Sequence, residues 1–160
     1  MTWQVTHPVV VPFDFSDHAL AALRKAVSIA DKPQQVHVLH VLPYLIPAEP
    51  GVVWATIDDS SRIAHALENL QAAVPQSKFG NVALDVRIGD PGRVASERAE
   101  ELGADLIVVG SHGRTGFTRL VLGSVAERVT RLAHCPVLVV KLPPETVASA
   151  SATAAAPATA

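Results

Sequence analysis

The sequence predicts an α/β fold in which a parallel sheet carries helices on both faces. Short apolar segments alternate with longer amphipathic segments between residues 9 and 140, and such alternation is typical of strands and helices in turn. Strands that alternate with helices form parallel sheets through right-handed crossovers. The 160 residues suit a single domain, and an apolar fraction of 49% is enough for a core. The expected order is βαβαβαβαβ.

The first half of the chain supplies two strand–helix units. Residues 9–11 are all valine and predict a buried strand. Ser16 can cap a helix after it, whose apolar positions are Leu20, Leu23, Val27 and Ala30. A second strand is predicted over 36–42. A proline-rich loop follows it, and a second helix then places four apolar residues on one face: Ile63, Leu67, Leu70 and Val74.

The second half adds three strands and two helices. Apolar and more polar residues alternate over 82–88, which favours an edge strand with one face on the core. Asp90 can cap a helix that has Pro91 at its first position and Gly103 just after its end. A fourth strand is predicted over 105–110, where the apolar run that starts at Leu106 is unbroken, as in a central strand. A helix is predicted from about Ser124, carrying Val125, Val129 and Leu132, and a fifth strand over 136–140.

Composition excludes several classes of protein. The formal net charge of −2 gives no reason to expect binding to nucleic acid or to an anionic membrane. The single cysteine, Cys135, cannot form an intramolecular disulfide and is expected to pack near a strand. No apolar run approaches a membrane span, and the start lacks a signal-peptide pattern. We therefore expect a cytoplasmic domain over residues 1–142, followed by a mobile low-complexity tail over 143–160.

The segment between residues 110 and 124 is the richest in chemistry. Its glycines would let backbone N–H groups approach a phosphate, and the helix that begins near Ser124 adds unpaired N–H donors. Four arginines against one glutamate between 110 and 134 leave a formal local charge of +3. Alternatively, the glycines only turn the chain. The segment matches neither the P-loop nor the dinucleotide pattern.

Three of its glycines set a recognisable spacing: Gly110, Gly113 and Gly123, the last followed by Ser124. This spacing resembles the ATP-binding signature of the universal stress protein family. Residues 105–116, 122–126 and 134–140 are similar to that family, as are Gly89-Asp90-Pro91 and the early turn at 12–16. The resemblance covers residues 7–141. It implies a three-layer fold with a five-stranded parallel sheet in the order 3-2-1-4-5 and four helices, as in the adenine nucleotide alpha hydrolase-like fold.

The resemblance also implies a ligand and its contacts. ATP, or ADP or cyclic AMP, is the expected ligand, with Mg or Mn as an optional companion of the nucleotide and no metal held by the protein alone. The implied phosphate contacts are Gly110, Gly113, Gly123, Ser124 and Val125, with His112 and Arg114 on the same loop. Asp14 and Val41 are implied near adenine and ribose. Asp14 has the alternative of capping its turn, and Val41 that of a core valine whose backbone alone would bind.

Three functions remain open at this point. The first is a nucleotide-binding stress or regulatory module, the second a slow ATPase or phosphate-transfer enzyme, and the third a nucleotide-independent dimeric scaffold. No catalytic residue is identified, because the sequence around His112 shows no recognisable catalytic motif. His37 and His40 are interpreted as satisfied sheet residues. The resemblance implies a homodimer through the fifth strand, at Val137, Leu138, Val139 and Val140, because an apolar edge favours pairing.

Overall fold

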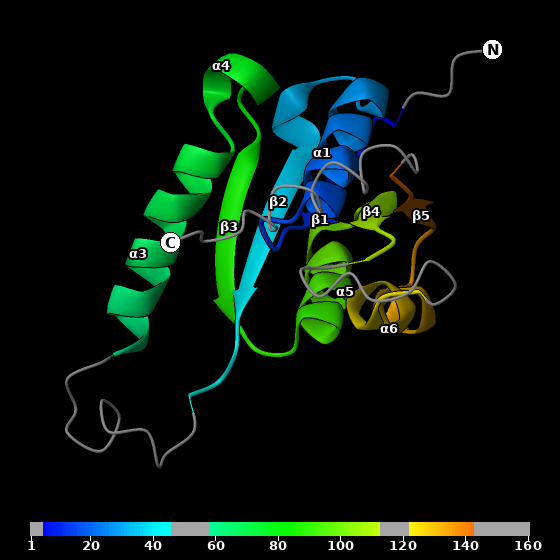
Figure 1. The fold of residues 1–160 in the computed structure, drawn as a ribbon. Helices are drawn as coiled ribbons and strands as arrows, with labels where there is room; N and C mark the ends of the chain where they lie inside the picture. Colours follow the sequence, from blue (N-terminus) through cyan, green and yellow to red (C-terminus); the bar gives the residue numbers. More distant parts are fainter. Residues whose placement is uncertain (1–4, 46–57, 113–121, 143–160) are drawn as a thin grey trace, which may run out of the picture.

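The computed structural model describes residues 5–45, 58–112 and 122–142 (Figure 1). Its five strands form one parallel sheet in the order β3-β2-β1-β4-β5. The strands are β1 (Val9–Pro12), β2 (Val36–Leu42), β3 (Ala83–Ile88), β4 (Leu106–Gly110) and β5 (Val137–Val140). The predicted fold and strand order are confirmed. The order reverses between β1 and β4, the place where α/β sheets bind ligands.

The four long helices also lie where the periodicity predicts them. They are α1 (Asp17–Ile29), α3 (Asp59–Ala73), α5 (Pro91–Leu102) and α6 (Ser124–Leu132). The structure adds the single turn α4 (Gln76–Phe79) and the 3₁₀ turn η1 (Pro33–Gln35). Neither was predicted, because three or four residues are too few to show a helical period.

The predicted helix ends are confirmed by their hydrogen bonds. The Ser16 hydroxyl accepts from the Ala19 N–H, and the Asp90 carboxylate accepts from the Arg93 N–H. Asp58 likewise accepts from the Ser61 N–H at the start of α3. Gly103 ends α5 in the left-handed conformation, with φ +59°. These local signals fix where each helix enters the layers around the sheet.

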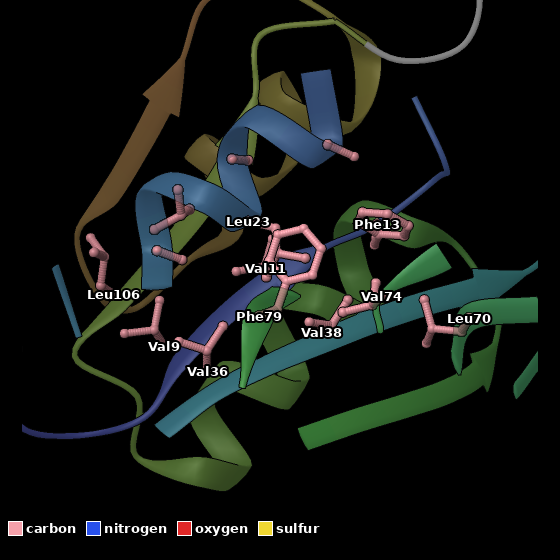
Figure 2. Packing of buried hydrophobic residues seen from close by; sticks show 14 of the residues in the cluster. Val9, Val11, Phe13, Leu23, Val36, Val38, Leu70, Val74, Phe79 and Leu106 are labelled. Carbon is pink, nitrogen blue, oxygen red and sulfur yellow. The ribbon is translucent and has the colours of Figure 1, made fainter. Parts of the chain in front are cut away.

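Both faces of the sheet are covered. Helices α1 and α3 pack on one face and α5 and α6 on the other. Figure 2 shows valines of β1 and β2 in the first of these cores together with Leu23 of α1. Alternate residues turn the opposite way, so that Val10, Leu39 and Ile107 belong to the second core. This two-sided burial explains why β1 and β4 are apolar throughout.

Two predicted apolar faces are confirmed only in part: the four predicted residues of α1 all lie in or against the first core, but they are buried to different degrees. The fully buried side of α1 is made mostly of small residues (Ala19, Ala22, Leu23 and Ala26), whereas Leu20, Val27 and Ala30 are only partly buried. Alanines carry little volume, which lets α1 approach the sheet closely. Leu132, predicted on the apolar face of the last helix, is 39% exposed, because it lies at the end of α6 beyond the buried Val129.

The two edges of the sheet are β3 and β5. On β3 the polar positions form ion pairs with α5: Arg87 binds Glu101 at 2.9 Å, and Arg98 binds Asp85 at 2.9 Å. All four residues of β5 are half-buried, and dimerisation through them stays a prediction. No helix within the described ranges is long and apolar enough to cross a bilayer. The predicted tail lies outside these ranges.

Candidate functional site

A pocket of about 250 Å³ opens at the carboxyl ends of β1 and β4, at the reversal of strand order. The turn after β1, the end of β2, the end of β4 and the start of α6 all contribute to it. Its lining comprises Pro12, Phe13, Asp14, Ala19, Leu39, His40, Val41, Pro91, Val109, Gly110, His112, Gly123, Ser124, Val125 and Ala126. Most of this lining is apolar, with polar groups at a few points, as is usual for small-molecule sites.

The pocket brings together most of the candidate site residues. Seven of them line it: Asp14, Val41, Gly110, His112, Gly123, Ser124 and Val125. These residues come from four separate parts of the chain, so their convergence is a product of the fold. Gly113 and Arg114 lie outside the described residues. His40 also lines the pocket and was interpreted only as a sheet residue.

Asp14 follows β1 in a tight turn. Its Oδ1 accepts hydrogen bonds from the Ser16 N–H at 3.1 Å and from the Ser16 hydroxyl at 2.5 Å. Asp14 therefore caps its turn, which is the alternative role that the sequence suggested for it. The same residue lines the pocket, and a carboxylate has room for several hydrogen-bond donors. Capping thus orients Asp14 at the pocket wall.

Phe15, the next residue, adopts φ +67°. A bulky residue in the left-handed region is strained and persists only where its surroundings hold it. The Phe15 ring packs edge-on against Phe13, with centroids 5.4 Å apart, and against His40 at 4.8 Å. These ring contacts hold the turn in a conformation that the backbone alone disfavours.

Gly110 has a packing role at this point, and its predicted phosphate contact stays a prediction. A Cβ built on it would lie 2.8 Å from the backbone carbon and oxygen of His18 in α1. Its φ is not in the left-handed region, so conformational freedom is not what it supplies. Gly110 is needed because α1 crosses the end of β4 at close range. Its place on the pocket wall follows from that packing.

The start of α6 faces the pocket with backbone donors. Gly123 is the N-cap and offers no side chain, so no side-chain cap forms there. Ser124, Val125 and Ala126 are the first three helical residues, and all line the pocket. The first N–H groups of a helix have no partner within it and carry partial positive charge. This end of the pocket therefore suits an anion such as a phosphate.

Two histidines meet at the buried Ser111, beside the pocket. The Ser111 hydroxyl lies 3.0 Å from Nδ1 of His112 and 3.4 Å from Nδ1 of His18. The two imidazole rings are 5.3 Å apart. Burial lowers the pKa of His18 below its ordinary value, His112 lowers it further, and Asp14 and Asp17 partly oppose the shift. The surroundings of His18 therefore favour its neutral form.

The lowered pKa of His18 predicts a pH-dependent stability. The unfolded chain binds this proton more readily, so the stability rises with pH through the window from the folded-state pKa to about 6.5. We expect the melting temperature to fall as the pH is lowered through that window. His37 has a lowered pKa, through burial and Arg98, and adds a slope of the same sign. His18→Gln should reduce the slope measured by differential scanning calorimetry; an unchanged slope would contradict the assignment.

The arginines around the glycine segment are less available than their count suggests. Arg128 donates to the Asp90 carboxylate at 2.6 Å, and Arg131 lies in the last turn of α6, far along the helix from its start. Arg114 and Arg119 lie outside the described residues. The predicted local charge of +3 thus overstates the positive charge near the pocket, because it ignored a carboxylate brought in from the start of α5.

The described residues provide neither a metal site nor a reactive thiol at the pocket. Within the described ranges, no three or more histidine, cysteine, aspartate or glutamate residues are placed to hold a metal ion. Cys135 is partly buried against the second core. Burial raises the pKa of its thiol, which disfavours the reactive thiolate and agrees with the expected packing role.

A doubly wound parallel sheet with a pocket at its switch point belongs to the class of α/β proteins that bind ligands beyond the carboxyl ends of their strands. The family model of the universal stress protein family matches residues 6–141. The chain is 38% identical to universal stress protein MJ0531 of Methanocaldococcus jannaschii over 142 residues, which cover 84% of this chain and 82% of the relative. The chain belongs to the universal stress protein family.

Solved structures show the same fold. The structure of universal stress protein UspA from Lactobacillus plantarum is 28% identical, with a TM-score of 0.64, and covers 86% of this chain and 98% of its own. A universal stress protein solved in complex with cAMP is 24% identical, with a TM-score of 0.57, and covers 88% of this chain and 100% of its own. At 24% identity, this similarity is evidence for the fold alone.

Proposed function

We propose that this universal stress protein binds an adenine nucleotide, with ATP as the first candidate, and acts as a regulatory module. The observation that carries the proposal is the pocket at the strand reversal, where an apolar wall meets the open start of α6. A planar base suits the apolar part, and a phosphate chain suits the N–H donors. One relative of this fold was solved with cAMP, a ligand of the same chemical class.

The polar groups suggest an orientation for the nucleotide. Gly123, Ser124 and Val125 offer backbone N–H groups and a hydroxyl to the phosphates. Asp14 and Val41 lie on the turn after β1 and near the end of β2, where they would contact the nucleoside. A divalent cation bound with the nucleotide, Mg or Mn, would be held by the phosphates, because the described residues hold no cluster for it. Gly113 and Arg114 are proposed to complete the phosphate contacts.

Nucleotide binding predicts a higher melting temperature. A ligand that binds only the native state stabilises it by RT ln(1 + [L]/Kd), about 2.7 kcal/mol at a hundredfold excess over Kd. For a chain of this size, that corresponds to a rise of roughly 5–10 °C. Differential scanning fluorimetry with ATP, ADP, cyclic AMP and GTP measures the rise and the base preference. Mass spectrometry of nucleotide released from freshly purified protein identifies the natural ligand.

The same titration separates this proposal from the scaffold alternative. A flat melting temperature across millimolar concentrations of every adenine nucleotide would leave dimerisation or scaffolding as the better account. Turnover of ATP in a phosphate-release assay would favour the enzyme alternative instead. We expect no turnover in the usual range of about 1–1000 per second.

A further inference from the structure

His40 lies at the point where the pairing of β1 with β2 stops. The register of these strands runs from Val9 opposite Val36 to Pro12 opposite Leu39. The Phe13 N–H donates to the Leu39 carbonyl at 2.8 Å, which continues the ladder by one hydrogen bond. Phe13 therefore stands opposite His40. In a parallel ladder, a residue bonds to the two residues that flank its opposite neighbour, here Leu39 and Val41.

The second of these two hydrogen bonds is replaced. The Phe13 carbonyl would ordinarily accept from the Val41 N–H. Instead, Nδ1 of His40 lies 2.8 Å from that carbonyl oxygen, and no backbone bond from Val41 to Phe13 occurs among the described residues. A carbonyl only accepts, so Nδ1 carries the hydrogen and donates it. The side chain of His40 thus takes the place of the next main-chain donor.

This replacement has a consequence at the pocket. The Leu39 carbonyl faces β1, and alternate residues of a strand direct their backbone groups to the same neighbour. The Val41 N–H is accordingly directed to the β1 side, where the chain has already turned away through Asp14 and Phe15. Val41 lines the pocket at this position and is partly buried. A backbone donor in such a place needs a partner, which a ligand can supply.

We propose that His40 is a positioning residue: it ends the β1–β2 ladder at Phe13 and thereby keeps the Val41 N–H available to a hydrogen-bond acceptor on the ligand. The inference rests on the proposed nucleotide site, where the acceptor is a ring nitrogen of the base. The edge contact between His40 and Phe15, with centroids 4.8 Å apart, holds the imidazole in place and supports the strained turn.

Substitution of His40 tests the role of each ring nitrogen. In His40→Asn, the side-chain amide can occupy the position of Nδ1 and keep the bond to Phe13. In His40→Gln, the amide reaches toward the position of Nε2, and in His40→Leu no donor remains. We expect the Kd for ATP to stay within about threefold of the wild-type value for Asn and to rise at least about tenfold for Leu, which is roughly 1.4 kcal/mol. The Kd for ATP of the Gln variant should rise as it does in the Leu variant.

Amide hydrogen exchange of the nucleotide-free protein provides a readout that does not depend on binding. In His40→Leu, the Val41 N–H can bond to the Phe13 carbonyl, so its exchange should slow relative to wild type, while Asn should retain the wild-type rate. His37→Leu, on the same strand but outside the pocket lining, is the matched control and should alter neither the Kd nor the exchange at Val41.

The outcomes separate this inference from the proposed function. If wild-type protein binds no adenine nucleotide but Val41 exchange slows in His40→Leu, the proposed ligand is wrong and the role of His40 at the ladder holds. An unchanged exchange rate at Val41, or equal ATP affinities for the Asn and Leu variants, would overturn the inference. If His40→Leu fails to fold, the ATP affinity and the Val41 exchange rate of His40→Asn are compared with those of His40→Gln instead. Equal values in these two variants would then overturn the inference.

Discussion

Replacing Gly110 with alanine is expected to lower the free energy of unfolding of the nucleotide-free protein by about 1–3 kcal/mol. The added methyl would lie 2.8 Å from the His18 backbone, which is closer than real Cβ atoms come. Backbone atoms cannot turn aside as a flexible side chain can, so α1 must shift as a unit. Each kcal/mol should lower the melting temperature by roughly 2–4 °C in a chain of this size. Chemical denaturation without nucleotide measures the loss.

Gly103 provides the matched control for this prediction. It has φ +59°, and nothing lies within 4 Å of a Cβ built on it. Alanine and serine there should cost nearly the same, because only the left-handed backbone conformation is penalised. At Gly110, serine should cost more than alanine, because the added oxygen enlarges the collision. Wild-type stability in both Gly110 variants would show that α1 does not need this glycine.

The sequence was sufficient to predict most of the fold. Apolar runs located β1 and β4, and the alternation over 82–88 correctly predicted an edge strand. Asp90 and Gly103 marked both ends of α5. These features depend on residues close together in the chain, and their energetic preferences act locally. The same reasoning missed α4 and η1, which are held by tertiary contacts such as that of the buried Phe79.

The candidate site was predicted less completely, because its properties depend on distant partners. The motif predicts a phosphate contact for Gly110, but it does not show that the backbone of His18 leaves no room for a side chain there. Arg128 counted as free positive charge, but Asp90 binds it from 38 residues earlier. His40 looked like an ordinary strand residue, because its role depends on where β1 stops pairing with β2. None of these relations leaves a local pattern in the sequence.

Gly113 is expected to behave in the opposite way to Gly110. It belongs to the same glycine segment, and we propose that its backbone N–H contacts a nucleotide phosphate. A hydrogen bond of that kind needs the backbone within about 3 Å of the phosphate oxygen. In Gly113→Val, the branched side chain would occupy that space and resist any left-handed conformation of the loop. We expect ATP binding to be abolished while the apo melting temperature stays close to the wild-type value.

The pair of substitutions therefore distinguishes a ligand contact from a packing contact within one motif. Calorimetric titration with ATP and denaturation without it, both on the same samples, give the two quantities for Gly110→Ala and Gly113→Val. Unchanged ATP affinity in Gly113→Val would remove this glycine from the site and weaken the assignment of the whole segment to phosphate binding. Loss of folding together with binding would instead mean that Gly113, like Gly110, is required for the conformation of the chain itself.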